Sequence, residues 1–295
     1  MDAMNIFKKI ALLGMTKRIK YPVPYLRLIQ KINIVWDKLI WLPNNCKIHR
    51  YSVKNIKVES IQCENIAPDN TIIYIHGGAF ILGLNNFYRT FAYFLSKKCK
   101  ARVILIDYDL APQAPYPIAL NQLLMVYLEL LKTIPSKNLI IAGDSAGGNL
   151  AVSLMILIKE FLLPLPVCSF ILSGWFDLTL QTATKAKNND PLITVDHLRQ
   201  VRDAYLQGVI PNWYLASPLY GDIRGFPPIF IHVGKNEILL NDSYEFAKKA
   251  QSNYIDVQYE VHPDMVHVHP ILFPRDTSSQ EVMRDISQFI SQHTK

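Results

Sequence analysis

The chain has 295 residues, about twice the usual length of a single domain, so it holds either two domains or one enlarged α/β or all-β domain. Half of its residues are hydrophobic and 19% are charged, which excludes intrinsic disorder and a coiled coil. The net charge is +7, but the basic residues are scattered rather than gathered in one stripe. The composition therefore gives no reason to expect a nucleic-acid partner.

The first 45 residues are amphipathic and basic. Apolar residues recur at three- and four-residue steps, for example Ile6 and Ile10, then Leu26 and Ile29, as on the buried stripe of a helix. Eight basic and two acidic side chains give this segment +6 of the net charge. We predict an N-terminal helical cap at residues 1–45 that packs on the body of the protein. Peripheral contact with a membrane surface or a lipid substrate is the alternative.

From residue 71 onward, short β-branched runs alternate with longer helical patterns. The runs predict strands at 71–75, 102–107, 138–142, 167–172, 229–233 and 255–261. The helical patterns cover 118–133, 149–163, 241–252 and 278–292. This alternation is typical of a mostly parallel sheet with helices on both faces. No repeat or Gly/Ser-rich linker divides the chain, so we predict one α/β core at residues 46–295.

A glycine-flanked serine follows the third of these predicted strands, in the run Leu-Ile-Ile-Ala-Gly-Asp-Ser-Ala-Gly-Gly. The pattern predicts a nucleophile elbow, in which Ser145 lies on a sharp strand-to-helix turn that Gly143 and Gly147 allow to close. Ser145 is therefore the candidate nucleophile, with Asp144 as a supporting residue. The amide of Ala146 and the dipole of the following helix favour negative charge beside it.

The first of the predicted strands runs into a His-Gly-Gly-Ala-Phe loop. Small residues allow the main chain to approach a substrate carbonyl, so the amides of Gly78, Ala79 and Ala146 are candidates for an oxyanion hole. His76 and Gly77 are expected to support this loop. The alternative is a tight turn whose glycines only reverse the chain.

A serine nucleophile requires a base, usually a histidine oriented by a carboxylate. His262, His267 and His269 follow the last predicted strand, where a loop would lie above the carboxyl edge of the sheet. We predict that His267 is the base, with His269 as the alternative. A metal site built from the three is not expected, because no carboxylate-rich or HExxH pattern accompanies them.

The orienting acid is expected after another strand. Glu237 comes first, just past the predicted strand at 229–233, and is the preferred acid. Asp242 is the alternative, although its place at the start of a helix suggests an N-cap. The order serine, acid, histidine is the order found in α/β hydrolases.

Together these motifs resemble the hormone-sensitive-lipase-like esterases, a bacterial family that is also similar to arylacetamide deacetylases. The resemblance covers about residues 70–292. The matching segments are His76-Gly-Gly-Ala-Phe80 with HGGGF, Tyr108-Asp-Leu-Ala-Pro112 with YRLAP, Gly143-Asp-Ser-Ala-Gly-Gly148 with GDSAGG, and then Ala216–Asp222, Pro227–Ile229 and Val233–Leu240.

The resemblance implies an α/β-hydrolase fold with a helical cap drawn from residues 1–45 and an insertion near 180–212. It implies a serine hydrolase that needs no cofactor and cleaves carboxylic esters with short or medium acyl chains. An amidase or deacetylase acting on small N-acyl or acetylated compounds is one alternative, and a non-catalytic ligand receptor on the same fold is another. Members of the family often form dimers, so a homodimer is a further expectation.

Three positions depart from the family pattern. Ala79 replaces the third glycine of the loop, and its amide remains usable if the position does not need a positive φ. Asp109 replaces an arginine and Gln113 a glutamate, so a structural ion pair is expected to be altered. Asp177 lies in a Gly-Trp-Phe-Asp stretch that also resembles the family, and we expect it to support structure rather than catalysis.

Four cysteines lie far apart in the sequence, namely Cys46, Cys63, Cys99 and Cys168. They form no CxxC pair, so neither a zinc site nor a disulfide framework is predicted. Free thiols suit a reducing compartment, and we expect a cytoplasmic protein. Lys8 and Lys9 interrupt the first apolar residues, and no signal peptide is recognised.

Overall fold

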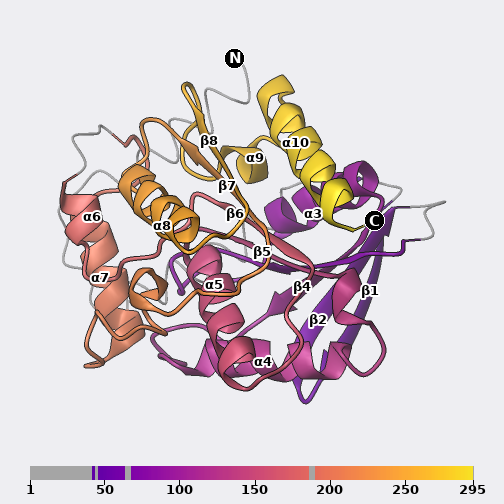
Figure 1. Cartoon of the computed structure of the whole chain (residues 1–295), viewed down its shortest axis with the longest axis horizontal. Helices are drawn as coiled ribbons and strands as arrows, with labels where there is room; N and C mark the ends of the chain where they lie inside the picture. The colour runs from indigo at the N-terminus through magenta and orange to yellow at the C-terminus, as the bar shows by residue number, and fades with distance from the viewer. Residues whose placement is uncertain (1–41, 44–45, 64–67, 186–189, 295) are drawn as a thin grey trace.

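The computed structural model describes residues 42–43, 46–63, 68–185 and 190–294. Within them, eight strands form one sheet in the order β1-β2-β4-β3-β5-β6-β7-β8 (Figure 1). The strands are β1 (Cys46–Val53), β2 (Ile56–Cys63), β3 (Thr71–Ile75), β4 (Arg102–Asp107), β5 (Leu139–Asp144), β6 (Cys168–Leu172), β7 (Ile229–Gly234) and β8 (Val257–His262). β1 pairs with β2 and β2 with β4 in antiparallel fashion, and the remaining pairs are parallel.

Helices lie on both faces of this sheet. They are α3 (Asn86–Cys99), α4 (Ile118–Leu130), α5 (Ser145–Glu160), α6 (Gln181–Thr184), α7 (Val195–Leu206), α8 (Leu240–Ser252), α9 (His269–Leu272) and α10 (Thr277–His293). Two short 3₁₀ turns, Ser136–Asn138 and Pro218–Tyr220, complete the regular structure of the described residues. No helix in the described ranges is both long enough and apolar enough to cross a membrane.

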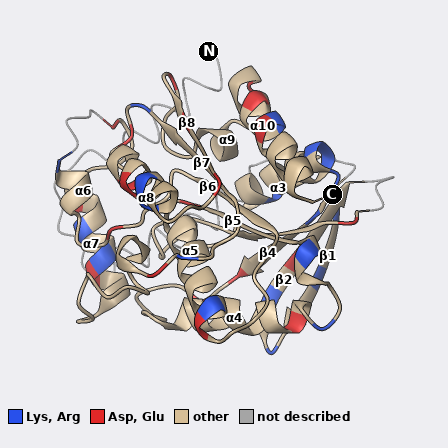
Figure 2. Cartoon of the chain, viewed as in Figure 1, with Lys and Arg blue, Asp and Glu red and all other residues tan. Residues whose placement is uncertain are grey.

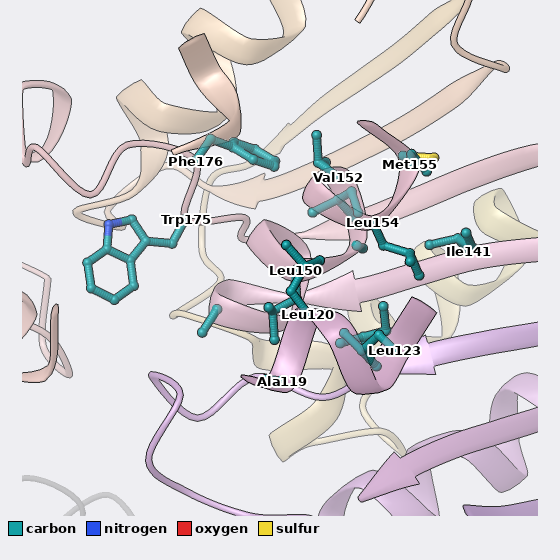
Figure 3. Packing of buried hydrophobic residues seen from close by; sticks show 14 of the residues in the cluster. Ala119, Leu120, Leu123, Ile141, Leu150, Val152, Leu154, Met155, Trp175 and Phe176 are labelled. Atoms are coloured by element: carbon teal, nitrogen blue, oxygen red, sulfur yellow. The ribbon is translucent and has the colours of Figure 1, made fainter. Parts of the chain in front are cut away.

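The sheet separates two hydrophobic cores. Alternate residues of a strand point to opposite faces, so Ile73 and Ile75 of β3 join the core under α4, α5 and α8. Ile72 and Tyr74 join the other core, under α3 and α10. Figure 3 shows the first core, where apolar side chains of α4, α5 and β5 meet. The central strands β3 and β6 carry no charged side chain, whereas charged residues lie along the outer helices (Figure 2).

The predicted strands and helices from residue 71 onward are all present, with ends that differ by a few residues. The largest difference is at α5, which begins at Ser145 rather than at 149, because the sharp turn after β5 leads directly into the helix. The hairpin β1–β2 and helices α3 and α7 were not predicted. The predicted cap at 1–45 lies outside the described residues except for 42 and 43, and the predicted insertion near 180–212 contains α6 and α7.

Candidate active site

Ser145 lies at the turn where β5 ends and α5 begins. Its φ is +50°, the left-handed conformation expected for a residue at a nucleophile elbow, and its side chain is nearly buried. Glycines permit the close approach around it. A Cβ at Gly143 would lie 2.5 Å from the carbonyl oxygen of Gly147, and one at Gly147 would collide with the carbonyl oxygens of Ile75 and His76. The elbow therefore packs directly against the end of β3.

The structure brings His267 and Glu237 to this serine. His267 lies in the loop between β8 and α9, and its Nε2 is 2.9 Å from Ser145 Oγ. Glu237 lies between β7 and α8, and its Oε2 is 2.7 Å from His267 Nδ1. The three side chains come from loops at the carboxyl ends of parallel strands, where sites in α/β sheets normally form. The serine, the base and the acid preferred from the sequence thus form one hydrogen-bonded line.

The second carboxylate oxygen of Glu237 is also held. Its Oε1 accepts hydrogen bonds from Ser173 Oγ at 2.8 Å and from the Gly234 amide at 2.5 Å. The same Ser173 hydroxyl oxygen accepts from the Val268 amide at 3.3 Å, so one side chain ties the acid loop to the histidine loop. Sequence reasoning missed Ser173, which follows β6 with a φ of +52° and belongs to no motif recognised here.

The environment raises the pKa of His267. Burial alone would lower it, because removal from water disfavours the imidazolium. The hydrogen bond and the charge of Glu237 act in the opposite direction and outweigh burial. Protonation of His267 is thereby made easier than in water, which suits a group that must accept a proton.

Asp144 connects the elbow to the loop after β3. Its Oδ1 accepts from the Gly77 amide at 2.9 Å and from Tyr74 Oη at 3.0 Å, and its Oδ2 accepts from Tyr88 Oη at 3.1 Å. Burial raises the pKa of this carboxyl to about 6, although the three donors oppose the shift. A Cβ at Gly77 would collide with the Asp144 carboxylate, so the glycine permits the contact. Tyr74 and Tyr88 had no sequence signal beyond being aromatic.

His76 lies below this loop and is buried. Its Nδ1 is 2.8 Å from the Gly77 carbonyl oxygen, and its ring stacks on Tyr108 with centroids 4.2 Å apart. Tyr108 Oη donates to the His76 carbonyl oxygen at 2.7 Å. Burial lowers the pKa of His76 to about 4, so the ring is neutral near pH 7. These contacts hold the loop in place.

Gly78 and Ala79 turn the loop with φ values of +96° and +55°. We expected the Ala79 amide to remain usable if this position did not need a positive φ. The position does adopt a positive φ, and alanine occupies the left-handed region at a cost of roughly 1 kcal/mol. The amides of Gly78, Ala79 and Ala146 have no hydrogen-bond acceptor anywhere in the described chain. All three N–H groups can therefore donate to a bound group.

The alternative candidates have other partners. His269 Nε2 is 3.2 Å from Asp276 Oδ2. Asp242 was expected to cap a helix, but it is the third residue of α8, and its Oδ2 accepts from the amides of Phe176 and Asp177 at 2.8 and 2.9 Å. Asp242 is therefore not an N-cap: as a buried carboxylate it needs hydrogen-bond donors, and two amides of a neighbouring loop supply them.

Asp177 and Asp109 have structural partners. Asp177 is fully buried and accepts from the amide and hydroxyl of Thr179 at 2.9 and 2.5 Å. The amide and carboxylate of Asp109 form a pair of hydrogen bonds with the Gln122 side chain, at 2.8 and 2.7 Å. Across the described ranges, no group of three or more His, Cys, Asp or Glu is placed to hold a metal ion.

Comparison with known proteins identifies the family. A family model for the alpha/beta hydrolase fold matches residues 72–271. The chain belongs to this family. It is 33% identical over 262 residues to an esterase of Acinetobacter venetianus, covering 86% of each chain. It is 34% identical over 209 residues to an acetyl-hydrolase of Streptomyces hygroscopicus, covering 68% of this chain and 70% of that one.

Solved structures extend the match to nearly the full length. An esterase of the bacterial hormone-sensitive lipase family superposes on this hydrolase with a TM-score of 0.91 and 25% identity, covering 99% and 98% of the two chains. The predicted α/β-hydrolase fold, the resemblance to hormone-sensitive-lipase-like esterases and the prediction of a hydrolytic enzyme are thereby confirmed. Membership of this family of esterases and acetyl-hydrolases supports ester hydrolysis as the reaction.

Proposed function

We propose that this hydrolase cleaves carboxylic esters of short to medium acyl chain, using Ser145, His267 and Glu237 and passing through an acyl-enzyme. The observation that carries the proposal is the continuous line from Ser145 Oγ through His267 to Glu237, with spacings of 2.9 and 2.7 Å. This is the arrangement in which a histidine can take a proton from a serine and be stabilised by a carboxylate once charged.

In the first step His267 Nε2 accepts the Ser145 hydroxyl proton while Oγ attacks the ester carbonyl carbon. The negative charge that develops on the carbonyl oxygen is stabilised by the amides of Gly78, Ala79 and Ala146, which have no competing acceptor among the described residues. The N-terminus of α5 adds its dipole at the same place. The protonated His267 then donates its proton to the leaving alkoxide, and the acyl group remains on Ser145.

In the second step a water molecule takes the place of the alcohol. His267 removes its proton, the water oxygen attacks the acyl carbon, and the same three amides stabilise the second oxyanion. Collapse of this intermediate releases the carboxylic acid and returns the proton from His267 to Ser145. Glu237 stays hydrogen-bonded to Nδ1 throughout and stabilises the imidazolium in both steps.

Two comparisons support the acyl-chain range. The relative from Streptomyces hygroscopicus is named an acetyl-hydrolase. A solved structure with a TM-score of 0.89 and 26% identity describes an enzyme soaked with p-nitrophenyl butyrate. We therefore propose p-nitrophenyl acetate and butyrate as the first substrates to be tried.

The direct test is Ser145→Ala assayed with these two esters. We expect kcat/KM to fall by at least about 10⁴-fold. Ser153→Ala is the matched control, because Ser153 is a buried serine of the same helix whose hydroxyl has no partner in the described chain. That variant should keep wild-type turnover. Undiminished hydrolysis by Ser145→Ala would refute the assignment of the nucleophile.

Two further readouts separate the alternatives. A fluorophosphonate probe should label the wild type at Ser145, whereas a non-catalytic receptor would stay unlabelled. Turnover of an anilide with the same acyl group should be much slower than that of the ester; faster anilide turnover would instead indicate an amidase.

A further inference from the structure

The register of the β1–β2 hairpin places two cysteines opposite each other. Cys46 is the first residue of β1 and Cys63 the last residue of β2, and the two are direct cross-strand partners. Their separation of 17 positions in the sequence had given no reason to pair them. Both side chains are partly buried and both thiols are free in the structure.

Cys46 and Cys63 form a non-hydrogen-bonded pair, the kind of antiparallel pair in which the side chains lie closest together. The turn residues Lys54 and Asn55 have φ values of +47° and +70°, as in a two-residue type I′ turn, which makes the flanking residues 53 and 56 a hydrogen-bonded pair. Hydrogen-bonded and non-hydrogen-bonded pairs alternate along an antiparallel ladder, so the pair seven steps further along is a non-hydrogen-bonded one.

The hydrogen bonds at the cysteines agree with this count. The Cys46 amide donates to the Pro43 carbonyl oxygen at 3.0 Å, and the Cys63 amide donates to Ser96 Oγ on α3 at 2.9 Å. Neither amide bonds to the opposite cysteine. Cα atoms in a non-hydrogen-bonded pair lie about 4.5 Å apart, within the range of about 4.4–6.8 Å that a disulfide spans.

The two thiols also share a face and an environment. Directly opposite residues of a pleated pair point to the same side, and Cys46 and Cys63 both pack on the core under α3 and α10, next to Ile48 and Ile61. Burial raises the pKa of Cys46 to about 11, and the neighbouring Cys63 contributes to the shift. The electrostatic coupling is a second sign that the two sulfur atoms are neighbours.

We propose that Cys46 and Cys63 form a reversible disulfide across the outer hairpin of the sheet. With a small-molecule disulfide such as oxidised glutathione as the oxidant, one cysteine thiolate attacks its S–S bond, releasing one glutathione and forming a mixed disulfide. The other cysteine then attacks the protein sulfur of that mixed disulfide and displaces the second glutathione. The two protein thiols lose two electrons and two protons, and oxidised glutathione is reduced to two thiols.

The geometry makes this bond easy to reduce. A Cα separation near the lower end of the permitted range strains a disulfide, and strained disulfides have more oxidising potentials than structural ones. A cell interior would therefore keep the pair reduced, and oxidising conditions would link it. The bond would join the first residue of β1, which follows the basic N-terminal segment in the sequence, to the end of β2. It joins β1 and β2, which lie four and three strands away from β5 in the sheet, so it does not depend on the proposed esterase chemistry.

The test uses the full-length protein equilibrated in buffers with increasing oxidised glutathione, then alkylated and digested with trypsin without reduction. Lys47, Arg50, Lys54 and Lys57 lie between the two cysteines, so trypsin separates them, and a disulfide joins the peptides 39–47 and 58–89. We expect the joined species to rise from near zero in dithiothreitol to the majority in excess oxidised glutathione, and to disappear when dithiothreitol is added back.

Matched variants complete the design. Cys46→Ser and Cys63→Ser should each abolish the joined species, whereas the double variant with Cys99→Ser and Cys168→Ser should keep it. Cys46 and Cys63 that remain alkylated at every ratio, or that carry separate glutathione adducts without joining, would overturn the proposal. A link from either of them to Cys99 or Cys168 would overturn it too.

Discussion

At the level of single residues, Glu237 is a carboxylate that is held at both of its oxygens. One oxygen accepts from Ser173 and Gly234, and the other contacts His267, while only 1% of the side chain is exposed. A carboxylate fixed this way cannot turn towards water when the imidazole charges. Its negative charge lies beside His267 Nδ1, and this charge and the hydrogen bond raise the pKa of His267 in spite of burial.

Glu237→Gln tests this effect through the pH profile. A general base must be neutral, so kcat/KM falls as the pH drops through the pKa of His267, which the glutamate raises. Glutamine removes the charge and leaves burial to lower that pKa. We expect the acid limb of the profile to move to lower pH, and kcat at the plateau to fall by on the order of 10²–10⁴-fold.

The measurement is kcat/KM for p-nitrophenyl butyrate from about pH 5 to 9, the range in which histidine titrates. Glu245→Gln is the control, because it makes the same chemical change on the exposed side of α8. An acid limb that stays at the wild-type pH in Glu237→Gln would show that another group controls it.

At the level of elements, the loop after β3 depends on backbone conformation as well as on the side chains that hold it. Gly78 has a φ of +96°, outside the region that alanine adopts readily, and a Cβ there would lie 2.7 Å from the Leu82 carbonyl oxygen. Ala79 has a φ of +55°, which glycine adopts at no steric cost. We therefore expect substitution to be harmful at Gly78 and nearly neutral at Ala79.

Gly78→Ala should lower kcat/KM by on the order of 10²-fold, because relief of the clash displaces an amide of the proposed oxyanion hole. It should also lower the free energy of unfolding by about 1–3 kcal/mol. Ala79→Gly should keep kcat/KM within about threefold and change the free energy of unfolding by less than about 1 kcal/mol, since relief of strain and added chain entropy oppose each other. Urea unfolding and ester turnover measure both, and equal losses in the two variants would contradict this account.

Burial and composition decide which strands and helices could be predicted from the sequence. β3, β5 and β6 are buried on both faces, so their residues form continuous apolar runs that are visible in the sequence. β1 is an edge strand with mostly exposed or partly exposed residues, and it lacks such a run. Helix α3 begins at an Asn85 cap and carries five aromatic residues among its 14, a composition that fits a strand as well as a helix.

At the level of the whole molecule, stability rests on the two cores that the sheet separates. α5 is buried from Ser145 to Ile158 and packs on the sheet next to β5, and Figure 3 shows side chains of α5 such as Leu150 and Leu154 in the core. The helices around the sheet carry charged residues instead (Figure 2). Loss of packing in α5 should therefore be felt by the entire fold.

Leu154→Ala removes a side chain that is 0% exposed, and we expect it to lower the free energy of unfolding by about 2–5 kcal/mol. Leu162→Ala makes the same change just past the end of α5, where the side chain is 92% exposed, and should alter stability by less than about 0.5 kcal/mol. Chemical denaturation of both variants compares them directly. Similar losses would mean that α5 does not hold the core together.

The sequence by itself determined the features that depend on neighbouring residues. The apolar strands, the helices that alternate with them and the turn at Ser145 each follow from steric and hydrophobic preferences within a few positions. Candidate roles could be assigned to Ser145, His267 and Glu237 because each follows a recognisable strand or motif.

Tertiary structure alone decided which distant groups meet. Ser173 beside Glu237, Tyr74 and Tyr88 on Asp144, and Cys46 opposite Cys63 are contacts between separate elements. Such contacts depend on strand order, register and packing across the core, and none of these is encoded in the local spacing of residues.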